Sequence, residues 1–200
     1  MTVHTRVRET SMPLSALAFC SRALLKLGAQ PIASLDEGTA EAEVAANLYP
    51  GLRDALLALH PWSFATAQAT LPRLAAAPVA DVPHAFQLPA DFLRAIGAGG
   101  PGRGRGLAYR ILEGRLHAAA PQVTLTYIFR PAESAFPAHF AAALVARLAA
   151  EFCTPLTENT GRAQMLLTQA EAELRAARRA DSQQATARAL SDFPLISIRG

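Results

Sequence analysis

Cysteine is scarce in this sequence of 200 residues, and the two that occur, Cys20 and Cys153, lie far apart. Neither belongs to a Cys-x-x-Cys pair or stands at a zinc-binding distance from a histidine, and the five histidines are isolated from one another. No metal site is therefore expected. Each cysteine falls in a helical apolar pattern, so both are interpreted as small buried side chains.

Catalytic motifs are lacking as well. The sequence contains no Gly-x-Ser-x-Gly elbow, no Walker phosphate loop, no His-Glu-x-x-His motif and no EF-hand loop. Asp36, Glu37 and Asp54 are better explained as helix-terminal and surface charges than as an acid–base pair. The chain is therefore not expected to be an enzyme, and no cofactor is expected.

Long apolar runs are missing too. The first ten residues are polar, and the apolar stretch 14–27 is interrupted by serines, Arg22 and Lys26, which argues against a signal peptide and a membrane span. Lys26 is the only lysine, and a net charge of +3 is too mild to indicate nucleic-acid binding by itself. We expect a soluble protein that is made in a reducing cytoplasm and does not contact a membrane.

Alanine is abundant, and 51% of all residues are hydrophobic. Because alanine loses no side-chain entropy in a helix and lets helices approach closely, the composition predicts a mainly helical protein. Residues 1–11 have little to bury and are interpreted as a flexible N-terminal arm. The helical periodicity begins at residue 12.

Two helices are predicted in the N-terminal part. The first covers 12–27, with Ser11 as its N-cap. Residues 34–37 read Ser-Leu-Asp-Glu, a capping box that would start a second helix. Its apolar phase continues across Pro50, where we expect a kink or a short break, and Pro61 ends it.

The middle of the chain, 62–131, is predicted to be β. Trp62, the only tryptophan, marks the change. Alternating apolar residues and turn signals predict short strands and a mostly antiparallel sheet. The predicted strands are 64–71, 86–88, 92–96, 107–112, 115–118 and 123–129, with a loop over 72–83.

Two more helices are predicted at 137–153 and 157–187, separated by a break at Thr154-Pro155. The segment 176–187 has almost no large apolar residue, so it is either solvated or covered by another subunit. The predicted fold is α+β, mainly α: a helical bundle with a small antiparallel β-sheet inserted between the N-terminal and C-terminal helices. The bundle would comprise 12–60 and 137–187.

The C-terminal tail, 188–200, is apolar and alternating, and no neighbouring strand in the sequence is left to pair with it. It could fold back on its own sheet or act as a docking strand that adds to a partner. The residues that would contact such a partner are Phe193, Pro194, Leu195, Ile196 and Ile198.

Residues 97–102 match the Gly-x-Gly-x-x-Gly pattern of dinucleotide sites letter by letter. Pro101 and the glycines that follow it exclude the helix that such a site needs, so we reject a dinucleotide site. The same loop carries Arg103 and Arg105, which could contact phosphate or a partner's carboxylates. The simpler interpretation is a mobile hairpin connection, because no aromatic residues alternate with the arginines.

Several short sequence segments are each a weak indicator of a protein family, but their order and spacing together are specific. They are Leu24-Leu25-Lys26-Leu27-Gly28, Ser34-Leu35-Asp36-Glu37, Leu48-Tyr49-Pro50, Arg53-Asp54, His60-Pro61-Trp62-Ser63-Phe64-Ala65 and Phe86-Gln87-Leu88-Pro89-Ala90-Asp91, together with Cys20, Pro31-Ile32, Leu56-Leu57, Tyr127-Ile128 and Phe136-Pro137. With these pieces the chain, over roughly 12–187, resembles the head-to-tail adaptors of short-tailed phages, the tail tubular protein A family.

The resemblance implies a structural virion protein at the head–tail interface. Such adaptors form a ring, twelve-fold in the family, beneath the portal; they extend the DNA channel and offer a platform for tail attachment. The implied partners are the portal protein, other copies of the chain, and a tail nozzle or stopper. DNA would pass through the lumen without sequence recognition. The tail 188–200 would bind the portal or a neighbouring subunit, and Arg103 and Arg105 would contact the tail or DNA.

The chain departs from the family in its compact sheet with a glycine–arginine loop and in its short end after residue 187. These departures leave open whether the tail partner is a nozzle or a stopper. The alternative function is a small basic DNA-binding module that uses Arg103 and Arg105. It would also use a second basic cluster, Arg175, Arg178 and Arg179.

Overall fold

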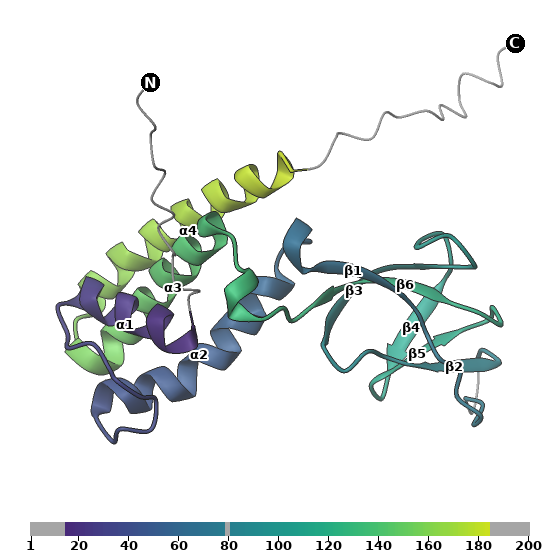
Figure 1. Cartoon of the computed structure of the whole chain (residues 1–200), viewed down its shortest axis with the longest axis horizontal. Helices are drawn as coiled ribbons and strands as arrows, with labels where there is room; N and C mark the ends of the chain where they lie inside the picture. The colour runs from purple at the N-terminus through teal and green to yellow at the C-terminus, as the bar shows by residue number, and fades with distance from the viewer. Residues whose placement is uncertain (1–14, 79–80, 185–200) are drawn as a thin grey trace, which may run out of the picture.

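The computed structural model describes residues 15–78 and 81–184. In this part of the chain the fold is α+β, with four helices and two small antiparallel sheets, about 48% helix and 19% strand. The helices form one end of the molecule and the strands the other (Figure 1). The N-terminal arm 1–11 and the tail 188–200, with Phe193, Pro194, Leu195, Ile196 and Ile198, lie outside the described residues.

Helix α1 spans Ala16–Leu27 and α2 spans Ala40–Ala58. The cap of α1 is Ser15, whose hydroxyl accepts from the amide of Ala18 at 3.3 Å, so the predicted start at residue 12 is wrong. The capping box also does not start α2. The Glu37 carboxylate accepts from the amide of Ser34, which is half of a capping box, but the Ser34 hydroxyl accepts from the amide of Asp36 instead of Glu37. The N-cap of α2 is Thr39, whose hydroxyl donates to Glu37 and accepts from the amide of Ala42.

Helix α3 spans Ala138–Thr157 and α4 spans Thr160–Ser182. The break predicted at Thr154-Pro155 is absent, because α3 continues through Pro155 and ends where Glu158 adopts a left-handed conformation. Likewise α2 runs unbroken through Pro50. Burial of the apolar stripe on both sides of Pro50 offsets the one hydrogen bond that a proline cannot donate.

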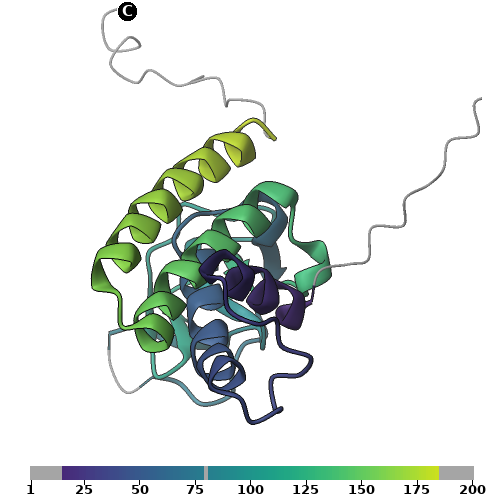
Figure 2. The same cartoon turned by 90° about the vertical axis from the view of Figure 1, so that its left-hand side faces the viewer.

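Helix α3 is the centre of the bundle, and the other three helices pack around it (Figure 2). By length and composition it could cross a membrane, but 61% of its most apolar window is buried inside the bundle, as in the core helix of a folded domain. Both cysteines are buried and unpaired, as predicted. The largest fully buried side chains of the bundle are Phe19, Leu24, Leu57, Trp62, Phe140, Leu144, Leu148 and Phe152.

The strands form two three-stranded sheets rather than the single sheet predicted. One has the order β1-β6-β3 and the other β2-β5-β4, and every pairing is antiparallel. The strands are β1 Thr66–Thr70, β2 His84–Gln87, β3 Phe92–Gly99, β4 Tyr109–Leu112, β5 Arg115–Ala118 and β6 Thr124–Phe129. Inner side chains of both sheets, among them Phe86, Leu116 and Leu125, share one small core.

Two predictions in this region are confirmed. The alternating segment 123–129 is the central strand β6, and Glu113 and Gly114 form the turn of the β4–β5 hairpin with φ of 50° and 69°. Positive φ at both central residues matches the right-handed twist of the flanking strands. Strand β6 faces two ways, since Leu125 packs in the sheet core and Ile128 in the bundle core. The strand therefore ties the two parts together.

Candidate functional site

Trp62 lies where the bundle passes into the sheets, and it is completely buried. Its indole N–H donates to the carbonyl oxygen of Leu56 at 3.1 Å, so the polar end of the ring is satisfied inside the core. The ring packs edge-on against Phe140 and His60, with centroids 5.1 and 4.8 Å away. This packing joins the end of α2 to the start of α3.

Asp181 is the buried polar residue at this junction; 4% of it is exposed. Its carboxylate accepts from the Ser63 hydroxyl at 2.7 Å and from the Ser63 amide at 3.0 and 3.1 Å. A carboxylate in the last turn of a helix faces the negative end of the helix dipole and needs donors from outside the helix. Ser63 supplies them, and the last turn of α4 is thereby fastened to the segment that follows Trp62.

Two histidines flank this carboxylate. His60 Nε2 lies 3.6 Å from one oxygen of Asp181, and His139 Nε2 lies 3.9 Å from the other. Burial lowers the pKa of His60 below its ordinary value, while the charge of Asp181 acts in the opposite direction. His139 Nε2 is itself buried and has no hydrogen-bond partner among the residues described.

This cluster does not have the geometry of a nucleophilic serine. The Ser63 hydroxyl donates directly to a carboxylate, whereas an activated serine donates to an imidazole that a carboxylate orients. Within 15–78 and 81–184, no group of three or more His, Cys, Asp or Glu side chains could hold a metal ion. The arrangement can join segments of the chain, and we call Ser63, Asp181, His60 and His139 the junction clasp.

A second polar network fastens the other side of the junction. Arg130, just after β6, forms a two-pronged pair with Asp54 of α2, at 2.6 Å for its shortest contact. Arg53 donates to Asp54 and to Glu133, both at 2.9 Å. Burial alone would raise the pKa of Asp54, but the hydrogen bonds from Arg130 and Arg53 lower it below the ordinary value. Asp54 is thus half-buried in an ionic network, and its interpretation as a surface charge is wrong.

Arg103 and Arg105 lie at the opposite end of the molecule, in the loop between β3 and β4. They line a concavity of about 600 Å³ together with Gln68, Ile96 and Thr126. The loop packs against the sheet, because the Thr126 hydroxyl donates to the carbonyl of Gly104 at 2.9 Å. It joins strands of two different sheets, so it is not the hairpin connection that was expected, and it leads into strand β4 rather than into a helix.

The second basic cluster is divided: Arg175 and Arg179 are exposed, whereas Arg178 is partly buried. Arg175 lies 3.9 Å from Glu171, and the Nε atom of Arg178 is buried beside the junction clasp. Ala177 and Asp181 of the same helix are buried. One face of the end of α4 is therefore covered by its own chain, whereas Ala176, Arg179 and Ser182 are exposed, so over the described residues 176–184 the segment is partly solvated, one of the two outcomes predicted for 176–187.

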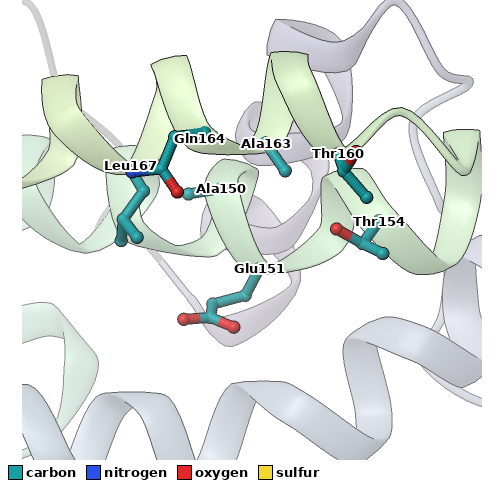
Figure 3. A pocket seen from close by; sticks show the side chains of 7 residues that line it. All are labelled: Ala150, Glu151, Thr154, Thr160, Ala163, Gln164 and Leu167. Carbon is teal, nitrogen blue, oxygen red and sulfur yellow. The ribbon is translucent and has the colours of Figure 1, made fainter.

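A groove crosses the bundle surface where α3 lies between α2 and α4. Its larger section, about 520 Å³, lies between α2 and α3, and the smaller section, about 280 Å³, between α3 and α4. Both sections share Ala150, Glu151 and Thr154, and Figure 3 shows Glu151 pointing from α3 away from α4. No residue of α1 lines either section.

Sequence reasoning missed Asp181, Arg130 and Glu133. The one available signal for Asp181 was its phase: it follows Leu166, Ala170 and Ala177 on the buried stripe of α4. An acidic residue on such a stripe requires buried donors.

No protein-family model matches this sequence, and no curated protein matches it either.

Proposed function

We propose that this chain is a head-to-tail adaptor, a structural virion protein that forms a ring under the portal and offers the tail its attachment platform. One observation carries the proposal. Several of the residues on which the family resemblance rests gather at the junction between the bundle and the sheets. Tyr49, Arg53 and Asp54 belong to the ionic network, and the stretch with His60, Trp62 and Ser63 forms the buried junction.

A fixed junction suits this function. The sheets project from one end of the bundle (Figure 1), and both polar networks hold them at a set angle. In the proposed ring the bundles lie side by side, and the sheets form a second tier that meets the tail. Arg103 and Arg105, in that tier, would contact the tail or the DNA, which passes through without sequence recognition.

The portal would be bound by the C-terminal tail. An extended apolar segment can add to an exposed sheet edge or fill a groove, and it loses its freedom only on contact with the partner. Phe193, Pro194, Leu195, Ile196 and Ile198 would supply this contact. A neighbouring subunit is the other partner that they fit.

Native mass tests the proposal. The chain is measured by ultracentrifugation alone and then mixed with the portal protein encoded beside it. A ring-sized species, formed alone or on the portal, is expected. A monomer that ignores the portal would overturn the proposal, and a monomer that shifts with DNA, with an affinity falling steeply with salt, would favour the DNA-binding alternative.

A further inference from the structure

The groove over α3 has an apolar floor and acidic rims. Val44 and Leu48 of α2 and Leu167 of α4 are partly buried hydrophobic residues that line it, and Glu43 and Glu151 stand among its polar residues. Glu151 already holds Arg147 at 2.6 Å. Glu43 forms no ion pair within the described ranges, so it is the carboxylate left for an incoming cation.

The outer face of α1 has the complementary character. Leu25 is 59% exposed, one of the most exposed large apolar side chains in the part of the chain that the structure covers. Arg22 lies three positions from Leu25 and four from Lys26, so it shares a helix face with each, and all three residues are exposed. Like Glu43, neither cation takes part in an ion pair among the residues described.

The two surfaces face away from each other. Figure 2 shows α1 on one side of the central α3 and α4 on the other, with the N-terminal half of α2 below them. The groove is lined by α2, α3 and α4 alone. Two different surfaces on opposite sides of one subunit can form a head-to-tail contact between copies, and such contacts generate a ring when the rotation from copy to copy closes.

We propose that the α1 face of one copy docks in the α2–α3–α4 groove of the next copy, so that these two surfaces form the subunit interface of the ring. Leu25 would lie on the apolar floor, and Lys26 and Arg22 would face Glu43. The inference rests on the proposed function. It specifies which surfaces of adjacent subunits are in contact and which charges make that contact specific.

Charge reversal tests this interface. Lys26→Glu and Glu43→Arg are made as separate variants and assembled with the same portal protein, with native mass as the measurement. Each variant alone places like charges in every interface, so loss of the ring-sized species is expected. In an equimolar mixture every contact between unlike variants pairs opposite charges, so the ring should return with the two variants alternating.

Arg115→Glu, an exposed reversal in β5 on the sheets, is the matched control and should assemble like the unmodified chain. Because Lys26 and Glu43 stand in terminal turns of their helices, circular dichroism checks that each variant folds. If either does not fold, Leu25→Ser replaces it. The expected result is then a folded chain that has lost the ring-sized species.

The outcomes separate the two proposals. If the unmodified chain never forms a ring, the adaptor function fails and the interface with it. If the unmodified chain forms rings and folded single reversals also do, or if the mixture does not recover the ring, the interface is overturned while the adaptor function stands.

Discussion

Asp181 illustrates what single residues decide in this molecule. It stands in the last turn of a basic helix, where its charge opposes the helix dipole, yet it is buried. Ser63, 118 positions earlier, supplies an amide and a hydroxyl to it. Hydrogen bonds to a charged acceptor are worth about 1.5–3 kcal/mol each, so a few such contacts can hold a helix end that has little apolar surface.

Trp62 carries the first prediction at this scale. Trp62→Ala should lower the free energy of unfolding by about 3–5 kcal/mol, because a fully buried ring and its hydrogen bond to Leu56 are lost and a cavity remains. Urea denaturation measures the change. Trp62→Phe keeps most of the packing and should cost clearly less. An unchanged unfolding curve for the alanine variant would mean that Trp62 is not part of the monomer core.

His60 carries the second prediction. Its pKa in the folded chain is below the ordinary 6.5, chiefly because it is partly buried. The unfolded chain then binds more protons in the interval between the two values, so stability rises with pH across it. As the pH falls from about 7.5 to 5, the stabilising contribution of His60 should begin to decrease near pH 6.5. It should decrease no further once the pH is below the pKa of His60 in the folded chain.

The measurement is urea unfolding at several pH values for the unmodified chain and for His60→Gln. The variant should have a flatter pH dependence over the same interval. His117→Gln, on β5 away from the junction, is the control and should keep the original slope. Equal slopes for all three proteins would exclude His60 as a source of the pH dependence.

At the scale of elements, local pattern predicted most of the structure. The periods of 3.6 and 2 located all four helices and the six strands approximately, because half-buried elements must place apolar residues on one side. Helix ends were less predictable. Thr39 competes with Ser34 for the cap of α2, and two prolines are tolerated inside helices because tertiary packing offsets them.

The division of the strands into two sheets could not be read from the sequence. It depends on β6 pairing with β1 and β3, while β5 pairs with β2 and β4, and these partners are not all neighbours in the chain. The packing of the loop between β3 and β4 could not be predicted either. Its glycines suggest a flexible loop, but Gly99 and Gly104 are needed because backbone and side-chain atoms lie against them.

A pair of alanine substitutions tests that loop. A Cβ atom at Gly99 would collide with the carbonyl oxygen of Arg103, whereas a Cβ at Gly100 would meet nothing within 4 Å. Gly99→Ala should therefore destabilise the chain by about 1–3 kcal/mol, as overpacking does. Gly100→Ala should stay within about 0.5 kcal/mol of the unmodified chain. Thermal unfolding of both variants measures this difference, and equal melting curves would mean that the loop is not packed.

At the scale of the whole molecule, contacts distant in the sequence determine the candidate site. Arg53 and Asp54 could be noticed as a pair of charges, but their partners Arg130 and Glu133 lie 76 and 80 positions away. Several residues quoted for the family resemblance, among them Arg53, Asp54 and Trp62, lie at the junction. Its residues meet because the strands leave the bundle after α2 and return to it before α3, which brings both connections to the same place.

The last prediction concerns the chain end. Deleting 190–200 should leave the monomer folded, because side chains from Phe19 to Ala177 already form continuous buried cores in the bundle and in the sheets among the described residues. The melting curve should be unchanged, whereas binding to the portal protein, followed by ultracentrifugation, should be abolished. Alanine replacement of Leu195, Ile196 and Ile198 in the full chain is the matched variant and should have the same effect. Portal binding that survives the deletion would remove the tail from the assembly mechanism and leave the bundle and the sheets as the binding surfaces.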